Sequence, residues 1–223
     1  MLFRSEKKAK EPLIPLKLFK NSQYTVLLIV GFICYFYQLA MNVYAPIGAM
    51  KVMGVSTSVA GALQMPRTII TIFLPTIAGV WVGKKSSNAW KAMVIGTLFA
   101  GLPMLAMGFT TTTTSIIVYF VALTITGIAE SYRCVSITPS AQAMLSQEDM
   151  GVGTSLVNFV NSLANTIAPA VFGVAYNLNT ATDPTNVTFI QNGVNAVFLL
   201  AGVVSIIGLV LVLFIVRPAM AEK

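Results

Sequence analysis

Residues 194–216, VNAVFLLAGVVSIIGLVLVLFIV, contain no charged side chain and decide the fold class of this chain. A helix of roughly 20 apolar residues crosses a hydrocarbon core of about 30 Å, so this stretch predicts a membrane-spanning helix. Mean hydropathy is +0.81 and 9% of residues are charged, which excludes an ordinary soluble domain. Five further apolar runs lie near residues 23–45, 58–82, 89–109, 115–138 and 152–176. The sequence therefore predicts an all-α polytopic membrane protein with six transmembrane helices.

Lysine and arginine gather on one side of these runs. Short basic loops stay on the cytoplasmic side of a membrane, so both termini are predicted to be cytoplasmic. We expect a basic cytoplasmic linker over 1–22, a six-helix bundle over 23–216 and a cytoplasmic tail over 217–223, in the plasma (inner) membrane. The opposite loops hold Lys51 alone, whereas the cytoplasmic segments hold Arg4, Lys7, Lys8, Lys10, Lys17, Lys20, Lys84, Lys85, Lys91, Arg217 and Lys223.

Composition excludes several classes of function. The chain has no histidine, which removes Ser-His-Asp and Cys-His catalysis and histidine-based zinc sites. No GxxxxGK[ST] loop is present to bind a phosphate. We therefore expect no enzyme, no cofactor and no metal. The net charge of +7 comes from the basic segments next to the spans, which predicts contact with anionic lipid rather than nucleic acid.

An internal repeat links the second and fifth runs. Gln64, Arg67, Pro75, Gly79 and Val80 are spaced by three, eight, four and one residues, and the same spacing recurs at Asn158, Asn161, Pro169, Gly173 and Val174. The two runs point in opposite directions across the membrane, because two runs lie between them. An inverted repeat of three plus three helices, as in secondary transporters, produces this pattern. Chance between two helices that contain proline and glycine is the other explanation.

Three stretches resemble the major facilitator superfamily, and most of all the C-terminal six-helix half of its 14-helix drug:proton antiporters. They are PLIPLKLFKN at 12–21, GVSTSVAGALQMPRTIITIFLPTIAGVWVGKK at 54–85 and GVGTSLVNFVNSLANTIAPAVFGVAYN at 151–177. The superfamily's basic loop signature is degenerate here, as GVWVGKKSSNAWK at 79–91. The resemblance implies half of a major facilitator fold.

The resemblance also implies a function and partners. The expected activity is secondary active transport of a small molecule, of the drug/proton antiport type, by one half of an alternating-access transporter. The partners would be the lipid bilayer, a small-molecule substrate and a second six-helix half or a homodimer, with the substrate near mid-bilayer between the units. The alternative is a non-transporting membrane subunit, a scaffold or a degenerate transporter fragment.

Three charged residues are predicted to lie within the membrane, away from the ends of the apolar runs: Arg67, Glu130 and Arg133. A charge at membrane depth normally faces a cavity or a partner. Glu130 and Arg133 are three residues apart on one predicted helix, so they share a face and can pair. One positive charge is then left over for a substrate, a lipid headgroup, a counter-ion or another subunit's carboxylate. From the helical rise, Arg67 and Glu130 are expected to differ in depth by roughly 10 Å.

The fifth run carries a polar stripe at helical spacing, and the first run carries polar and aromatic side chains. In lipid such a stripe must face protein or water, either as interhelical contacts or as the lining of a cavity. Tyr44 is expected in the interfacial aromatic belt. The candidate residues for substrate passage or gating are Gln38, Gln64, Arg67, Glu130, Arg133, Asn158 and Asn161.

Overall fold

The structure is a computed structural model that describes residues 16–218; residues 1–15 of the predicted linker and 219–223 of the predicted tail lie outside this range. Within it the elements are helices, without strands, which confirms the all-α prediction. Six candidate membrane spans are present, at Ser22–Lys51, Thr57–Gly83, Ser87–Met107, Ile116–Gln142, Met150–Thr180 and Val187–Val216. The first span consists of α2 (Ser22–Leu39), η2 (Ala40–Tyr44) and α3 (Ala45–Lys51), and η1 (Leu16–Lys20) precedes it. The second span consists of α4 (Thr57–Ala62) and α5 (Met65–Gly83). The remaining four spans are α6 (Ser87–Met107), α7 (Ile116–Gln142), α8 (Met150–Thr180), and α9 (Val187–Leu211) together with η3 (Val212–Val216).

Polar side chains begin several of these helices at the ends of the apolar runs. Asn21 accepts hydrogen bonds from the backbone N–H groups of Gln23 and Tyr24 at the start of α2. Ser115 and Asn186 cap α7 and α9 in the same way. Such caps satisfy N–H groups that have no partner within the helix. Helix bounds are therefore set by caps as well as by hydropathy, and several helices extend beyond the apolar runs.

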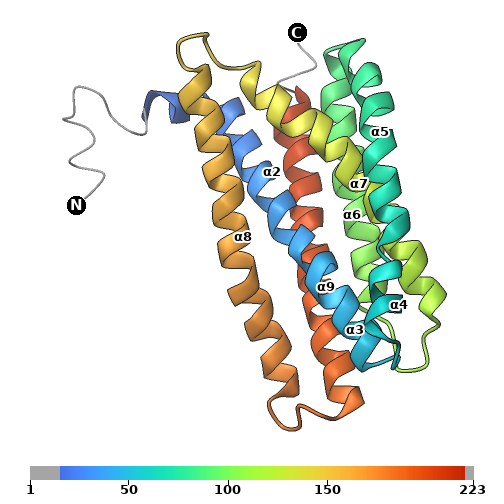
Figure 1. The fold of residues 1–223 in the computed structure, drawn as a ribbon. Coiled ribbons are helices and arrows are strands. Elements are labelled where there is room, and N and C mark those ends of the chain that lie inside the picture. The colour runs from blue at the N-terminus through green and yellow to red at the C-terminus, as the bar shows by residue number, and fades with distance from the viewer. Residues whose placement is uncertain (1–15, 219–223) are drawn as a thin grey trace, which may run out of the picture.

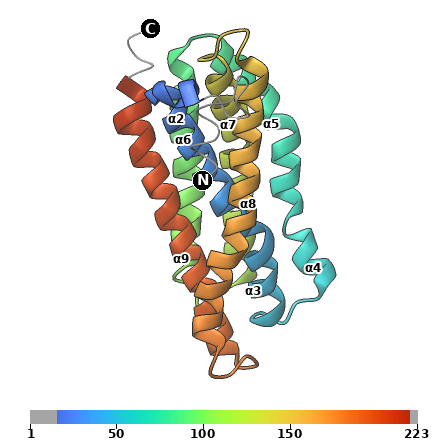
Figure 2. The same ribbon diagram turned by 90° about the vertical axis from the view of Figure 1, so that its left-hand side faces the viewer.

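The helices form an elongated bundle in which α2 and α7 cross the middle of one face (Figure 1). On that face α8 flanks α2 and α5 flanks α7, while α6 and α9 lie behind them, as the turned view also shows (Figure 2). The first residues of α2 and the last of η3 lie at the same end of the bundle, as an even number of spans requires. The loops α5–α6 and α7–α8 lie at this end, and the other connections lie at the opposite end.

The packing follows the inverted repeat of three plus three helices. The second span packs on the fourth through α5 and α7, as the fifth packs on the first through α8 and α2, and α6 packs on α9. The residues matched by spacing take equivalent places: Arg67 lies against Gly127 of the fourth span, and Asn161 lies against Gly31 of the first. The second and fifth spans are also the least buried, with 6% and 28% of their most apolar segments buried.

The contact between α5 and α7 depends on the missing side chain of Gly127. A Cβ atom at Gly127 would lie 3.0 Å from the carbonyl oxygen of Arg67 and 3.1 Å from its Cα. Small residues at such crossings let helix backbones approach closely in membranes.

We predict that Gly127→Ala separates α5 from α7 and lowers the free energy of unfolding by about 1–3 kcal/mol, because a backbone has to shift. Gly173→Ala is the matched control, since a Cβ there meets no atom within 4 Å. Thermal unfolding in detergent measures both. Equal stability of the two variants would contradict the close contact.

Candidate functional site

Two irregular segments face each other where the first two spans meet. The first span contains the π-helix η2 at Ala40–Tyr44, and the second is interrupted between α4 and α5. Across this junction Gln64 Nε2 donates to the carbonyl oxygen of Met41 at 3.1 Å, and Arg67 Nη1 donates to Asn42 Oδ1 at 2.6 Å. Single π-helical turns within α-helices are frequent at functional sites. Two polar side chains of the second span thus brace the irregular turn of the first.

Glu130 and Arg133 form an ion pair on α7, directly beside this junction. Arg133 Nε donates to Glu130 Oε2 at 3.0 Å, and Arg133 Nη2 donates to the other carboxylate oxygen. The guanidinium also lies over the ring of Tyr35, 4.3 Å from its centroid. Bidentate arginine–carboxylate pairs and cation–π contacts both gain strength away from water. The pair holds Arg133, which is 7% exposed, in a fixed position.

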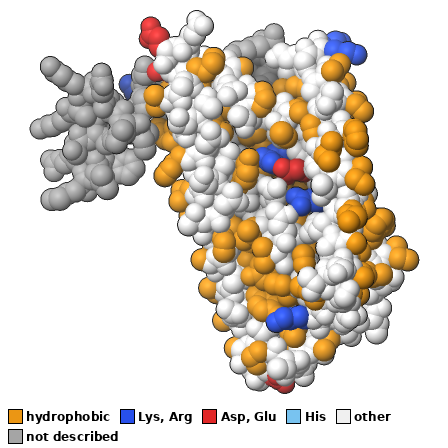
Figure 3. Space-filling model, in the orientation of Figure 1, with side chains coloured by type: hydrophobic (Ala, Val, Ile, Leu, Met, Phe, Trp, Pro, Cys, Tyr) orange, Lys and Arg blue, Asp and Glu red, His pale blue; other side chains and the backbone are white. Residues whose placement is uncertain are grey.

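Arg67 lies closer to the ion pair than the sequence-based depth estimate of roughly 10 Å allowed. Its backbone packs on Gly127, which precedes Glu130 by three residues, or about 4.5 Å of helical rise. Arg67 is within electrostatic range of both Glu130 and Arg133. Figure 3 shows charged side chains of both signs gathered halfway along an otherwise mostly uncharged face.

The other predicted residues lie apart from this charged cluster, which we define as Gln64, Arg67, Glu130 and Arg133. Asn161 is buried and meets the first span at Gly31. Asn158 is exposed on α8, and the stripe around it is exposed at Ser155, Ser162 and Asn165. Gln38 is half-buried on α2, one turn before Asn42. The structure therefore brings the four charged-cluster residues to adjoining parts of the second and fourth spans, and places Gln38, Asn158 and Asn161 elsewhere on the first and fifth spans.

Tyr44 does not take its predicted place in an interfacial aromatic belt. Its side chain is 7% exposed and its ring packs against those of Phe172 and Tyr176 on α8, at centroid distances of 6.3 and 5.6 Å. The prediction was wrong because hydropathy does not distinguish a tyrosine at the interface from one between two helices.

Sequence reasoning missed a second polar cluster near the end opposite to the termini. Gln191 Nε2 donates to Thr110 Oγ1 at 2.9 Å, and Asn195 Nδ2 donates to the carbonyl oxygen of Thr110 at 2.7 Å. These bonds fasten the α6–α7 loop to α9. The signal was present in the sequence, because Gln191 and Asn195 are one turn apart at the start of the most apolar span.

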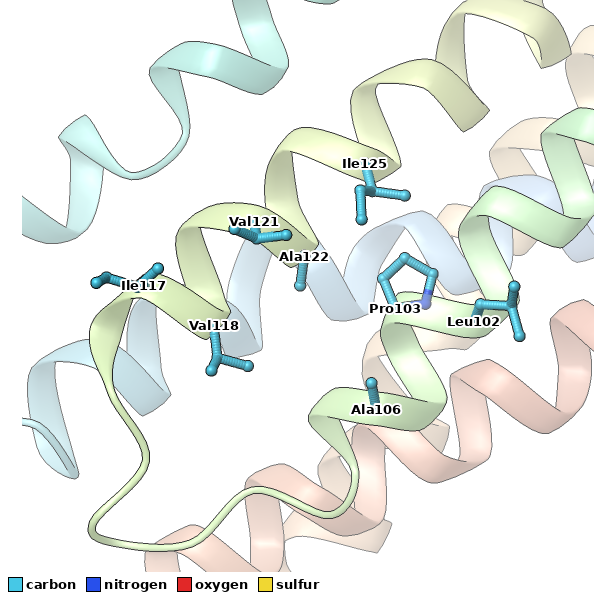
Figure 4. A pocket seen from close by; sticks show the side chains of 8 residues that line it. All are labelled: Leu102, Pro103, Ala106, Ile117, Val118, Val121, Ala122 and Ile125. Carbon is cyan, nitrogen blue, oxygen red and sulfur yellow. The ribbon is translucent and has the colours of Figure 1, made fainter.

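An apolar groove between α6 and α7 has a volume of about 430 Å³ and is separate from the charged cluster (Figure 4). Its lining consists of aliphatic side chains and proline, among them Pro103, Val121 and Ile125. A binding site for a polar molecule needs a few convergent polar groups to orient it, and this groove offers none. The charged cluster is therefore the better candidate site.

We predict that Glu130→Gln lowers the free energy of unfolding by about 3 kcal/mol, because it leaves two arginines without their acid. Adding Arg133→Gln to that variant should restore part of the loss. A double-mutant cycle on thermal stability in detergent measures the coupling between the residues. Glu148→Gln, the same change at an exposed acid, is the control and should have little effect.

Near-zero coupling, with both single variants as stable as the original chain, would contradict a structural ion pair. Glu130 would then be better explained as a proton-exchanging residue.

Comparison with known proteins adds the family. The model of the major facilitator superfamily matches residues 2–169. The multidrug transporter protein MdtP of Bacillus subtilis (strain 168) is 29% identical over 77% of this chain and 31% of its own length. Multidrug resistance protein 3 of the same organism is 25% identical over 77% of this chain and 33% of its own length. The riboflavin transporter RibZ of Clostridioides difficile (strain 630) is 23% identical over 97% of this chain and 48% of its own length.

The matched region thus spans half or less of these relatives. The family match, the six helices and the inverted repeat agree with the resemblance found in the sequence. The superfamily consists of transporters rather than enzymes, and this chain belongs to the major facilitator superfamily.

Proposed function

We propose that this chain is one six-helix half of an alternating-access transporter that moves a small molecule across the plasma membrane. The single observation that carries the proposal is the polar surface of α8. Ser155, Asn158, Ser162 and Asn165 are exposed on a membrane-spanning helix. Within a bilayer such side chains have to face protein or water. A second six-helix unit across a wet central cavity provides both.

The charged cluster lies on a face of the bundle that has α8, the helix of the stripe, as one of its flanks (Figures 1 and 3). The face that holds it is formed by α2 and α7, with α5 and α8 as flanks (Figures 1 and 3). The low burial of α5 and α8 leaves both flanks free to contact a second half or another copy. Substrate would then lie between the units at mid-membrane, where the two units rock against each other.

Drug/proton antiport is the finer proposal, and it rests on the resemblance and on the names of two multidrug relatives. Glu130 is the one acidic residue within the six described spans, and it is the candidate for proton exchange. The alternative, a non-transporting membrane subunit, is favoured by the ion pair, because Arg133 binds both carboxylate oxygens of Glu130.

We also propose cytoplasmic termini, and cysteine labelling tests this orientation. After Cys34→Ser and Cys134→Ser, single Ser86→Cys and Thr185→Cys variants are treated with an impermeant maleimide in intact cells. We expect labelling at position 185 and not at 86, because the basic residues Lys84 and Lys85 flank the latter loop. The reverse pattern would contradict the orientation.

The isolated monomer is predicted not to transport, because one half supplies one wall of the cavity. Reconstituted into liposomes, the chain should take up the dye ethidium only as a dimer or together with a second six-helix half. Chemical cross-linking in the same liposomes reports the oligomeric state. Robust uptake by a demonstrated monomer would overturn the half-transporter proposal.

A further inference from the structure

Three buried polar atoms near the charged cluster have no hydrogen-bond partner within the described part of the chain. They are Oε1 of Gln64, Nε of Arg67 and the hydroxyl oxygen of Tyr37, for which the neighbouring thiol of Cys34 is a weak and poorly placed partner. The Tyr37 side chain is 3% exposed, so the other side chains shield its hydroxyl almost completely. A buried polar group without a partner is costly, and native proteins rarely keep three together without a reason.

The three atoms belong to one place in the fold. Gln64 and Arg67 are one turn apart at the start of α5, and Gln64 donates to the carbonyl oxygen of Met41. Tyr37 precedes Met41 by four residues on the first span, which places it one turn away on the same face. Tyr37 also lies within electrostatic range of Arg67, Glu130 and Arg133. Two donors and one acceptor thus come from adjoining turns of the first two spans.

The charges of this region do not balance. Glu130 is hydrogen-bonded to Arg133 through both carboxylate oxygens, so that pair is neutral as a unit. Arg67 donates from Nη1 to the amide oxygen of Asn42, which carries no charge. One positive charge therefore remains at membrane depth, and an anion there would gain more than it would in water.

We propose that Arg67 and Tyr37 form a binding site for the anionic group of an organic substrate. A carboxylate, or an equally charged oxygen group, would accept hydrogen bonds from Arg67 Nε and from the Tyr37 hydroxyl. Gln64 Oε1 would accept a hydrogen bond from a donor on the same molecule, and the ring of Tyr35 lies beside the ion pair. The substrate class is a small aromatic or apolar monoanion, in contrast to the cationic drugs expected from the family resemblance.

The site lies next to the face that holds the charged cluster, and the side chains that cover Arg67 Nε and the Tyr37 hydroxyl have to move aside for a ligand to bind. Asn42 is exposed and Arg67 is half-buried, so the arginine extends from the surface of the bundle into its interior. Its Nη1 is engaged by Asn42, and its Nε is turned to the buried side without a partner. Arginine binds carboxylates well along the edge that contains Nε, because two parallel N–H groups point there.

Calling the ligand a substrate rests on the proposed transport function, but the test of this inference measures binding and needs no transport. The full chain in zwitterionic nanodiscs is titrated with benzoate, benzamide and benzylamine, which share one ring and differ in charge. Binding is followed through the shift in thermal unfolding. We expect benzoate to bind roughly tenfold or more tightly than either of the others, as one charge-assisted hydrogen bond allows.

Variants assign that preference to the site. Arg67→Gln should abolish the preference for benzoate, Arg67→Lys should keep part of it, and Tyr37→Phe should weaken benzoate binding alone. Lys51→Gln removes an exposed positive charge at the end of α3 and is the matched control, with no expected effect. If Arg67→Gln does not fold, Arg67→Lys and Tyr37→Phe still decide the question.

Equal binding of the three compounds, tighter binding of benzylamine, or no binding of any of them at about millimolar concentration would overturn the inference. The bound anionic group can belong to a substrate or to a lipid headgroup, and nanodiscs that contain the anionic lipid phosphatidylglycerol distinguish the two. Displacement of benzoate by that lipid, with the charge preference lost, would assign the site to a lipid headgroup and overturn the substrate assignment. Selective benzoate binding without uptake in liposomes would overturn the transport proposal alone, whereas uptake without charge preference would overturn this inference alone.

Discussion

The hydrocarbon core of a membrane offers no hydrogen bonds, and the arrangement of polar groups in this protein follows from that constraint. Backbone groups are satisfied within helices, and where the helix is irregular a side chain takes over. The carbonyl oxygen of Met41 lies in a π-helical turn and accepts from Gln64 across the interface between two spans. The break before α5 places Gln64 and Arg67 where this turn needs donors. Two irregularities in different spans are therefore parts of one contact.

The lack of hydrogen-bonding partners in the hydrocarbon core also acts on the charged side chains, which are only partly paired. Glu130 and Arg133 neutralise each other at short range on one helix. Arg67 has a neutral partner at Nη1, and its own Nε and the side-chain oxygens of Gln64 and Tyr37 lack a well-placed partner among the described residues. A protein that needed these groups only for stability would gain by pairing or removing them. Their persistence at mid-membrane, on the face between the least buried spans, fits a region that receives a ligand.

Close contacts between helix backbones position these polar residues but do not bond to their polar groups. Gly127 lets the backbone of Arg67 approach α7, and Gly31 takes the equivalent place opposite Asn161. The repeat thus places a glycine opposite the matched position twice, against the backbone of Arg67 in one copy and against the side chain of Asn161 in the other. The two copies therefore differ in their side chains, with charge on the second and fourth spans and neutral polar groups on the fifth.

The sequence by itself determined the six spans and indicated the inverted repeat and the family, because hydropathy, proline and glycine spacing and short motifs are properties of the chain alone. It also gave the pairing of Glu130 with Arg133, since both lie on one turn of one helix. The tertiary structure decided what depends on two helices at once. The place of Arg67 beside the ion pair, the contact of Gln64 with Met41 and the burial of Tyr44 all follow from helix breaks and crossing points. No periodicity within a single span encodes the depth at which another span crosses it.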